Sequence, residues 1–494
     1  MSRNVLVNIL NAAASILLAA ITVPLALHFV GLNGFGVWTL AQTALFYVAT
    51  AETGIGPALQ RFISVARGTG ELKQAARLIW SASALYTALG AAVGAATVLL
   101  APAIVRLFDV DRALRADAVE MFRVTGVVML LALLAGGLAN VLQGLERFVA
   151  ATVATTIAAV VFLIAAPILL AADYGLKGLA LAALAQQAAG VVVRVWMIRD
   201  VLASTRPGWI TRGEARELVS FSARLQVNVA STLINSQTDK LVVGLVASNA
   251  TLGAVGIASQ AAEAVRFFLG AALGPINARL AVVHGTGDGG GLAALYHRLE
   301  NIWIRVNIGI TALATALMPA LIIAWVGEDT GDAAQFATIL TFGYCVSVLS
   351  GPALAYLRAI GRINPEALLG LGLIAANVVL TVVLGIAFGA IGVVTATSIA
   401  YTVITIVFFW RVHPILPPRP ADSPPAIQPR VIAAALGTAA LAGAWGTAMA
   451  LLLPRLVALV PIGLGAAVAL AAFVVLTTDG LEELGIRLPG RRRA

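Results

Sequence analysis

The chain has 494 residues, of which 60% are hydrophobic and only 11% are charged. Soluble domains carry about 25% charged residues, so a soluble protein of this length could not hide so much apolar surface, and the composition predicts a membrane protein. The net charge of +9 does not indicate nucleic-acid binding, because the positive charges lie in short loops between apolar segments.

A membrane-spanning helix needs about 20 mostly apolar residues, and fourteen segments meet that requirement. Span length and the absence of period-2 alternation favour helices over a barrel. The first segment is too long for a signal peptide and ends at no small-residue cleavage site, so we expect it to remain as a helix. The predicted spans are 5–30, 36–59, 78–100, 121–143, 149–171, 177–198, 219–246, 254–280, 301–326, 335–357, 366–387, 389–410, 431–453 and 456–477.

Lys and Arg residues predict the orientation of these helices. Of the 32 in the chain, three are embedded in spans, five lie in odd-numbered loops and 24 lie in even-numbered loops or at the two ends. Cytoplasmic loops are enriched in Lys and Arg, so we expect both termini in the cytoplasm. The five in predicted outer loops are Arg106, Arg112, Arg115, Lys177 and Arg455, and the embedded ones are Arg123, Lys240 and Arg266.

The sequence repeats itself at an offset that drifts from 218 to 214 residues. GPALQRFISVARGTG at 56–70 returns as GPINARLAVVHGTG at 274–287, LQGLER at 142–147 as LRAIGR at 357–362, and YGLKGLA at 174–180 as FGAIGVV at 388–394. Internal duplication in an apolar chain is typical of transporters built from two lobes around one site. Six helices separate the repeats, so we expect the lobes to point the same way through the membrane.

The predicted fold class is an all-α polytopic membrane protein with two parallel-repeat six-helix lobes and two C-terminal helices. The Pro-rich run HPILPPRPADSPPAIQP at 413–429 is poor in helix and predicts a tether. We expect the following boundaries: an N-lobe at 1–200, a cytoplasmic linker at 201–218, a C-lobe at 219–411, a Pro-rich linker at 412–430, the last helix pair at 431–478 and a cytoplasmic tail at 479–494.

Polar residues inside the spans point to a wet cavity, because each one costs free energy in hydrocarbon unless it faces protein or water. Helical spacing places Asn4, Asn8, Asn11, Ser15 and Thr22 on one face of the first helix. The seventh helix carries a similar stripe. Hydrogen bonding between helices within each lobe is the alternative explanation. The cavity candidates are Asn8, Asn11, Gln42, Asn228, Asn235, Lys240, Gln260 and Arg266.

Three embedded acids are candidates for ion coupling. Glu52 has no sequence-local partner, and a lone carboxyl in a membrane helix is suited to carry a proton or a cation. Asp239 lies next to Lys240, and adjacent residues on a helix do not face each other. Glu263 lies one turn before Arg266, so that pair could instead neutralise itself. Structural hydrogen bonding is an equally open interpretation for Glu52.

No catalytic constellation is apparent, so we expect a protein that is not an enzyme. The four His residues are far apart, the spacing of His and Cys fits no metal site, and the Gly-rich run at 285–291 follows no strand. Cys345 lies in an apolar stretch and is interpreted as a core residue. A membrane glycosyltransferase remains an alternative, although the longest predicted outer loop, 101–120, is short for such an enzyme.

Several short motifs occur in order along residues 1–410. They are GLNGFGVW at 31–38, TGIGPALQR at 53–61, TDKLVVG at 238–244, LGAVGIASQA at 252–261 and the LRAIGR loop. With the fourteen-helix plan, they resemble the O-antigen and oligosaccharide flippases of the polysaccharide-transporter family. That family belongs to the superfamily that also holds MATE drug antiporters and lipid II flippases.

The resemblance implies a V-shaped pair of bundles that works by alternating access in the bacterial cytoplasmic membrane. The implied cargo is a polyprenyl-diphosphate-linked oligosaccharide, moved to the outer leaflet without a cofactor and driven by H⁺, Na⁺ or the membrane potential. Membrane lipids and polysaccharide polymerase or assembly proteins are the implied partners. Flippase cavities of this kind are rich in cationic residues, and this sequence departs from that pattern, because only Lys240, Arg266, Arg123 and Arg224 qualify. A MATE-type proton- or sodium-coupled antiporter is the alternative.

Overall fold

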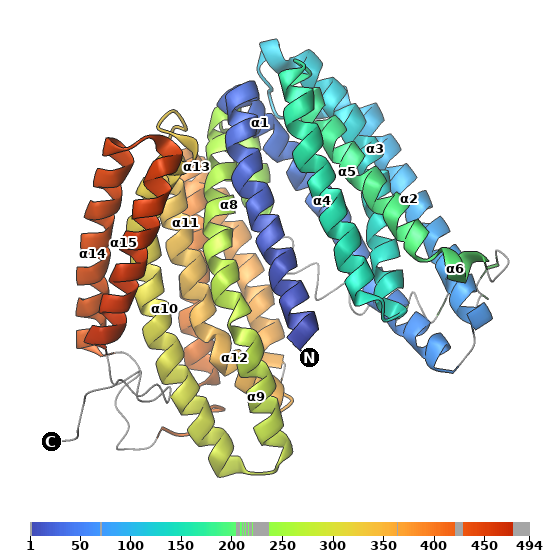
Figure 1. Cartoon of the computed structure of the whole chain (residues 1–494). Helices are drawn as coiled ribbons and strands as arrows, with labels where there is room; N and C mark the ends of the chain where they lie inside the picture. The colour runs from blue at the N-terminus through green and yellow to red at the C-terminus, as the bar shows by residue number, and fades with distance from the viewer. Residues whose placement is uncertain are drawn as a thin grey trace. The chain divides into compact units, whose positions relative to one another are not determined.

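A computed structural model describes residues 2–69, 72–203, 208, 209, 211, 213, 216, 220, 237–362, 364–419 and 428–477. Regular structure in these ranges is helical throughout (Figure 1). Eleven of the described helices are long and apolar enough to cross a membrane. The prediction of an all-helical polytopic membrane protein is therefore confirmed, while the count of fourteen spans stays a prediction.

The chain divides into two compact units, Met1–Gly253 and Ala254–Ala494. The predicted lobe and linker boundaries stay predictions. The first unit begins with α1 (Ser2–Gly68), α2 (Leu72–Leu107), η1 (Arg112–Leu114), α3 (Arg115–Gly144), α4 (Phe148–Ala171), α5 (Gly175–Met197) and α6 (Arg199–Ala203). There follow α8 (Asn249–Ala271), which crosses the unit boundary, α9 (Leu273–Gly285), α10 (Gly289–Val326), α11 (Ala333–Ser347), η2 (Val348–Ser350), α12 (Gly351–Ala359), α13 (Asn364–Val412), α14 (Pro429–Leu452) and α15 (Arg455–Leu476).

Two of the longest helices are each interrupted by a glycine. α1 departs from helical geometry at Gly31 (φ 66°, ψ 179°), and α13 does so at Gly389 (φ 65°, ψ −145°). Positive φ is disfavoured for residues with a Cβ, which explains glycine at both points. Both breaks fall at predicted outer connections, so each of these labels covers two helical runs.

The backbone repeats along with the sequence. Glu146 and Gly361, which the repeat aligns, both have positive φ, and so do Gly175 and Gly389. The helix that ends before Glu146 and the helix that ends before Gly361 are closed by equivalent hydrogen bonds. The backbone amide of Arg147 donates to the carbonyl of Leu142, and the backbone amide of Arg362 donates to the carbonyl of Leu357, at 2.8 Å in both cases. The duplicated segments therefore build the same local structure in each unit.

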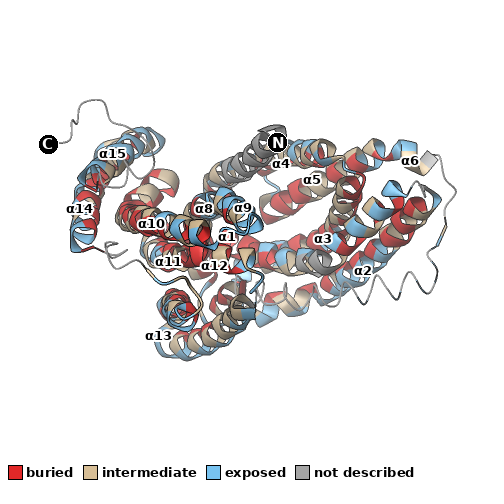
Figure 2. Ribbon diagram, turned by 90° about the horizontal axis from the view of Figure 1, so that it is seen from below, coloured by how far each residue is buried: buried red, intermediate tan, exposed pale blue. Residues whose placement is uncertain are grey.

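Within the first unit, α3 packs between α2 and α5, and buried residues follow its length (Figure 2). Gly94 of α2 and Gly126 of α3 meet face to face, since a Cβ added to Gly94 would lie 2.4 Å from the Gly126 carbonyl oxygen. Lipid is as apolar as leucine, so close backbone approach and dispersion hold membrane helices together where the hydrophobic effect does not. A larger residue at either glycine would separate α2 from α3.

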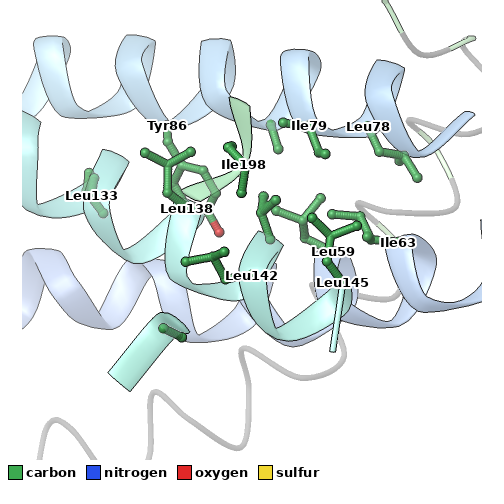
Figure 3. Close-up of a cluster of buried hydrophobic side chains, with 13 residues drawn as sticks. Leu59, Ile63, Leu78, Ile79, Tyr86, Leu133, Leu138, Leu142, Leu145 and Ile198 are labelled. Carbon is green, nitrogen blue, oxygen red and sulfur yellow. The ribbon is translucent and has the colours of Figure 1, made fainter. Parts of the chain in front are cut away.

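A cluster of large side chains ties the ends of α1, α2 and α3 to the residue that follows α5. Figure 3 shows Tyr86 from α2 and Leu142 from α3 in this cluster, with Ile198 covering them. In the second unit a comparable cluster joins α9, α10, α12 and the end of α13. Its fully buried members include Leu280, Tyr296 and Leu357.

The last two helices pack against α10 (Figure 1). The contact is lined by small residues such as Ala320, Ala324 and Ala442. The indole Nε1 of Trp445 donates to the carbonyl of Pro461 at 2.9 Å and joins α14 to α15. The helix pair is thus a packed part of the second unit.

The described half of the Pro-rich segment, 413–419, contacts α10. Arg419 donates to the carboxylate of Glu300 at 2.9 Å and to the side-chain oxygen of Asn301 at 3.0 Å. A ring nitrogen of His297 lies 3.2 Å from the carbonyl oxygen of Pro418. Residues 413–419 follow the end of α13 and contain no helix, as the sequence predicts for a tether, and they are docked on α10. Residues 420–427 lie outside the described ranges.

Candidate functional site

Arg266 of α8 is held between two tyrosines. Its guanidinium carbon lies 5.4 Å from the ring centre of Tyr344 in α11 and 5.3 Å from that of Tyr401 in α13. The Tyr401 hydroxyl accepts a hydrogen bond from Nη1 at 3.2 Å. The two rings meet edge to face, with centres 5.5 Å apart, and both tyrosines are buried. Three helices therefore converge on one cation.

Within the described ranges, no carboxylate lies within 4 Å of this guanidinium. Glu263 lies one turn earlier on α8 and is half-buried. The self-neutralising pair considered from the sequence is thus not formed at contact distance. A cation in a low-dielectric site without an adjacent anion favours an anionic ligand.

Arg266 and Tyr401 line a cavity of about 190 Å³ inside the second unit. Three hydroxyl groups share its wall, and each donates its hydrogen to a backbone carbonyl: Ser347 to Tyr344 at 2.6 Å, Ser350 to Ser347 at 3.0 Å and Thr405 to Tyr401 at 2.7 Å. With their hydrogens used in this way, the oxygens keep lone pairs that can accept.

The remaining polar residue in the wall is Glu366, whose charge is already paired. Its Oε2 accepts from Nε of Arg358 in α12 at 2.9 Å, and the second carboxylate oxygen contacts the same guanidinium. The rest of the wall is apolar, from Leu354 to Phe408. The cavity therefore combines one available cation, several acceptors and an apolar side.

A second polar group lies in the first unit, where Asp239 and Gln237 expose only 7% and 5% of their surface. The side chain of Thr238 is hydrogen-bonded to Tyr47 of α1, and the charge of Asp239 acts on the same tyrosine. Lys240 is half-buried beside them. Three neighbouring polar residues are thus packed near α1.

The other candidate residues from the sequence differ in their exposure to solvent, and some of them lie outside the described set. Gln42 is exposed on α1, and Gln260 and Glu263 are half-buried on α8. The helix α1 contains Asn8, Asn11 and Glu52, whose side chains lie outside the described set. The described ranges do not include Asn228 and Asn235. The cavity and coupling roles assigned to these residues stay predictions.

Sequence reasoning did not single out Tyr344 and Tyr401. It also missed two asparagines whose buried hydrogen bonds stabilise the second unit. Asn377 of α13 accepts from Thr381 and Thr397, both at 3.3 Å, and so ties together the two runs of α13. Asn307 of α10 donates to the carbonyl of Cys345 at 3.2 Å. Such bonds are typical of helix association in membranes, and a polar residue within an apolar span was the available signal.

The sequence profile of the family described as "Polysaccharide biosynthesis protein" matches residues 1–325. No curated protein matches the chain. Among solved structures, a lipid II flippase MurJ in an inward closed conformation is 13% identical, with a TM-score of 0.73, covering 99% of this chain and 100% of that one. An inward-facing MATE multidrug resistance transporter is 14% identical, with a TM-score of 0.69, covering 81% of this chain and 94% of that one.

An outward-facing MATE transporter is also similar, at 15% identity, a TM-score of 0.56, and coverage of 84% of this chain and 95% of that one. These matches confirm an all-helical membrane fold of the MATE and lipid II flippase type, while the exact number of spans stays a prediction. The chain therefore belongs to the polysaccharide biosynthesis protein family and has the fold that MATE and lipid II flippase structures share.

Proposed function

We propose that this protein is a transporter that moves a polyprenyl-diphosphate-linked oligosaccharide from the cytoplasmic to the outer leaflet of a bacterial inner membrane. The main support for the proposal is the share of this chain that each solved structure matches. The match to the lipid II flippase extends over 99% of the chain and so takes in α14 and α15, whereas the MATE matches cover 81% and 84%. An additional helix pair such as α14 and α15 can contact the long apolar tail of a lipid-linked cargo.

The physical requirements of this cargo agree with the residues present. Sugar hydroxyls cannot enter hydrocarbon without losing their hydrogen-bond partners, so the headgroup needs polar side chains along its path. Its diphosphate needs a cation, and Arg266 has no contacting carboxylate in the described ranges. The tail can stay in lipid. We propose that Glu52, Asp239 and Glu263 contribute to coupling with H⁺, Na⁺ or the membrane potential.

Deletion of the gene tests the proposal. The expected result is that the lipid-linked repeat unit accumulates on the cytoplasmic leaflet and that surface polysaccharide is lost. The wild-type gene should restore the polymer, and an Arg266→Gln gene should restore much less. Normal polymer in a deletion strain that carries no second flippase would refute the function.

A MATE-type antiporter is the second candidate, favoured by the fold match at a TM-score of 0.69. It predicts that overproduction raises resistance to toxic organic cations and that vesicles show pH- or sodium-dependent efflux. An organic cation would be repelled by the positive charge of Arg266, which instead suits an anionic cargo. Efflux that persists in Arg266→Gln, together with unchanged polysaccharide in the deletion strain, would favour the antiporter.

A further inference from the structure

Two tyrosines fix the cation of the second unit in place. An arginine side chain has several rotatable bonds and loses entropy when it is ordered. Here the faces of Tyr344 and Tyr401 lie 5.4 Å and 5.3 Å from the guanidinium carbon, and the Tyr401 hydroxyl takes one of its five donors. The packing orders the plane of the guanidinium before any ligand arrives.

The tyrosines are themselves fixed. Both are buried, at 4% and 6% exposure, and their rings contact each other edge to face. They come from α11 and α13, so the position of Arg266 depends on how those two helices pack against α8. A preorganised donor binds an anion more tightly than a mobile one, because less freedom is lost on binding.

The cavity beside Arg266 suggests what it recognises. The hydroxyl oxygens of Ser347, Ser350 and Thr405 have used their hydrogens on backbone carbonyls and can only accept. A ligand that satisfies both parts of this wall carries an anion for the guanidinium and hydroxyl donors for the oxygens. A phosphate joined to a sugar has that combination, and a cavity of about 190 Å³ admits a group of that size.

We infer that Tyr344 and Tyr401 are positioning residues, which hold Arg266 so that it takes the phosphate next to the first sugar of the cargo. The inference rests on the proposed function. It assigns different parts to the two rings. Tyr344 contacts the guanidinium with its aromatic face, whereas Tyr401 contacts it with its face and its hydroxyl.

Binding of farnesyl diphosphate to the full-length protein in lipid nanodiscs tests this inference, with farnesol as the uncharged control. Loss of one cation–π contact weakens binding about two- to fivefold, and loss of one hydrogen bond about fivefold. We therefore expect Tyr344→Leu and Tyr401→Phe each to weaken binding of the diphosphate. Farnesol binding should not change in any variant.

A double-mutant cycle separates positioning from a general structural role. In an Arg266→Gln background, Tyr344→Leu should cause no further loss of diphosphate affinity, because there is no guanidinium left to hold. Tyr174→Leu, at an exposed tyrosine of the first unit, is the matched control and should bind like wild type. Tyr401→Phe keeps the ring and its packing, so it tests the inference even if Tyr344→Leu does not fold.

The possible results separate the positioning role of Tyr344 and Tyr401 from the proposed transport function. If wild type binds farnesyl diphosphate no better than farnesol, both fail. If wild type prefers the diphosphate and Arg266→Gln loses that preference, but Tyr344→Leu and Tyr401→Phe keep wild-type affinity, only the positioning role is wrong. Equal losses for Tyr344→Leu in the wild-type and Arg266→Gln backgrounds would also overturn it.

Discussion

At the scale of single residues, the repeat places a glycine and a glutamate in the same backbone conformation. Gly361 has φ 76° and Glu146 has φ 58°. A Cβ at Gly361 would meet no atom within 4 Å, so substitution there changes backbone strain alone. We expect Gly361→Ala to destabilise the protein by about 1–2 kcal/mol, measured as a lower thermal unfolding midpoint in detergent.

Gly437 provides the control, because it lies inside α14 and a Cβ there also has open space. Alanine is the better helix former by about 1 kcal/mol, so Gly437→Ala should raise the midpoint or leave it unchanged. If both alanine variants shift the midpoint in the same direction by the same amount, positive φ is not what requires glycine at position 361.

The ion pair between Arg147 and Asp200 predicts a pH dependence. Nη1 of Arg147 donates to Asp200 at 2.8 Å and to the Met197 carbonyl at 2.6 Å, and this lowers the pKa of Asp200 from its usual 3.8 to about 2. A lowered folded-state pKa stabilises the protein above the unfolded value and loses that effect as the pH falls. The side chain of Asp200 is 58% exposed, so screening keeps the effect small.

Asp200→Asn should therefore lower the unfolding midpoint at neutral pH, and its difference from wild type should narrow as the pH falls from about 4 to about 2. Asp173→Asn, at a loop acid that has no ion pair within the described ranges, is the control measured over the same pH range. A difference that stays constant down to pH 2 would mean that the charge of Asp200 does not stabilise the fold.

At the scale of elements, the Pro-rich connection is held by charge. Glu300 is largely buried and accepts from Arg419 at 2.9 Å and from the Tyr296 hydroxyl at 2.5 Å. Removing one partner of a buried charge pair leaves the other charge uncompensated. Arg419→Gln should therefore release the segment 413–419 from α10.

A nitroxide attached through Pro417→Cys reports this release as a sharper electron paramagnetic resonance spectrum. Arg411→Gln is the matched control, because Arg411 is exposed and stacks on Trp410. An unchanged spectrum in Arg419→Gln would show that apolar contacts of the segment, such as those of Ile415 and Leu416 with the buried cluster of α9, α10, α12 and α13, suffice to hold it.

These elements show what the sequence could predict and what it could not. Runs of apolar residues were sufficient to predict an all-helical membrane fold. The repeated motifs contain Gly175, Gly361 and Gly389, and all three adopt positive φ. Arg266 stood out because a cation in an apolar span is costly. Its tyrosine partners did not, because Tyr401 lies 135 residues away and tyrosine is unremarkable in a membrane helix. The contact between Arg419 and Glu300, 119 residues apart, was hidden for the same reason.

At the scale of the whole molecule, the sequence predicts the direction of each repeat through the membrane. An even number of helices between repeats predicts parallel lobes with the termini in the cytoplasm, and the uneven distribution of Lys and Arg gives the same orientation. Cys345 is the single cysteine and is buried, so a cysteine introduced elsewhere can be labelled against a low background.

We expect a membrane-impermeant maleimide to label Arg112→Cys and Glu328→Cys in intact cells, because these exposed positions precede or follow spans at predicted outer loops. Lys73→Cys and Gly290→Cys, which are exposed near the start of α2 and α10, should react only after the membrane is permeabilised. Each lobe thereby supplies one outer and one inner position at equivalent points of the repeat. Labelling of Gly290→Cys in intact cells while Lys73→Cys stays protected would mean that the lobes are inverted, and alternating access would then have to work around an axis in the membrane plane.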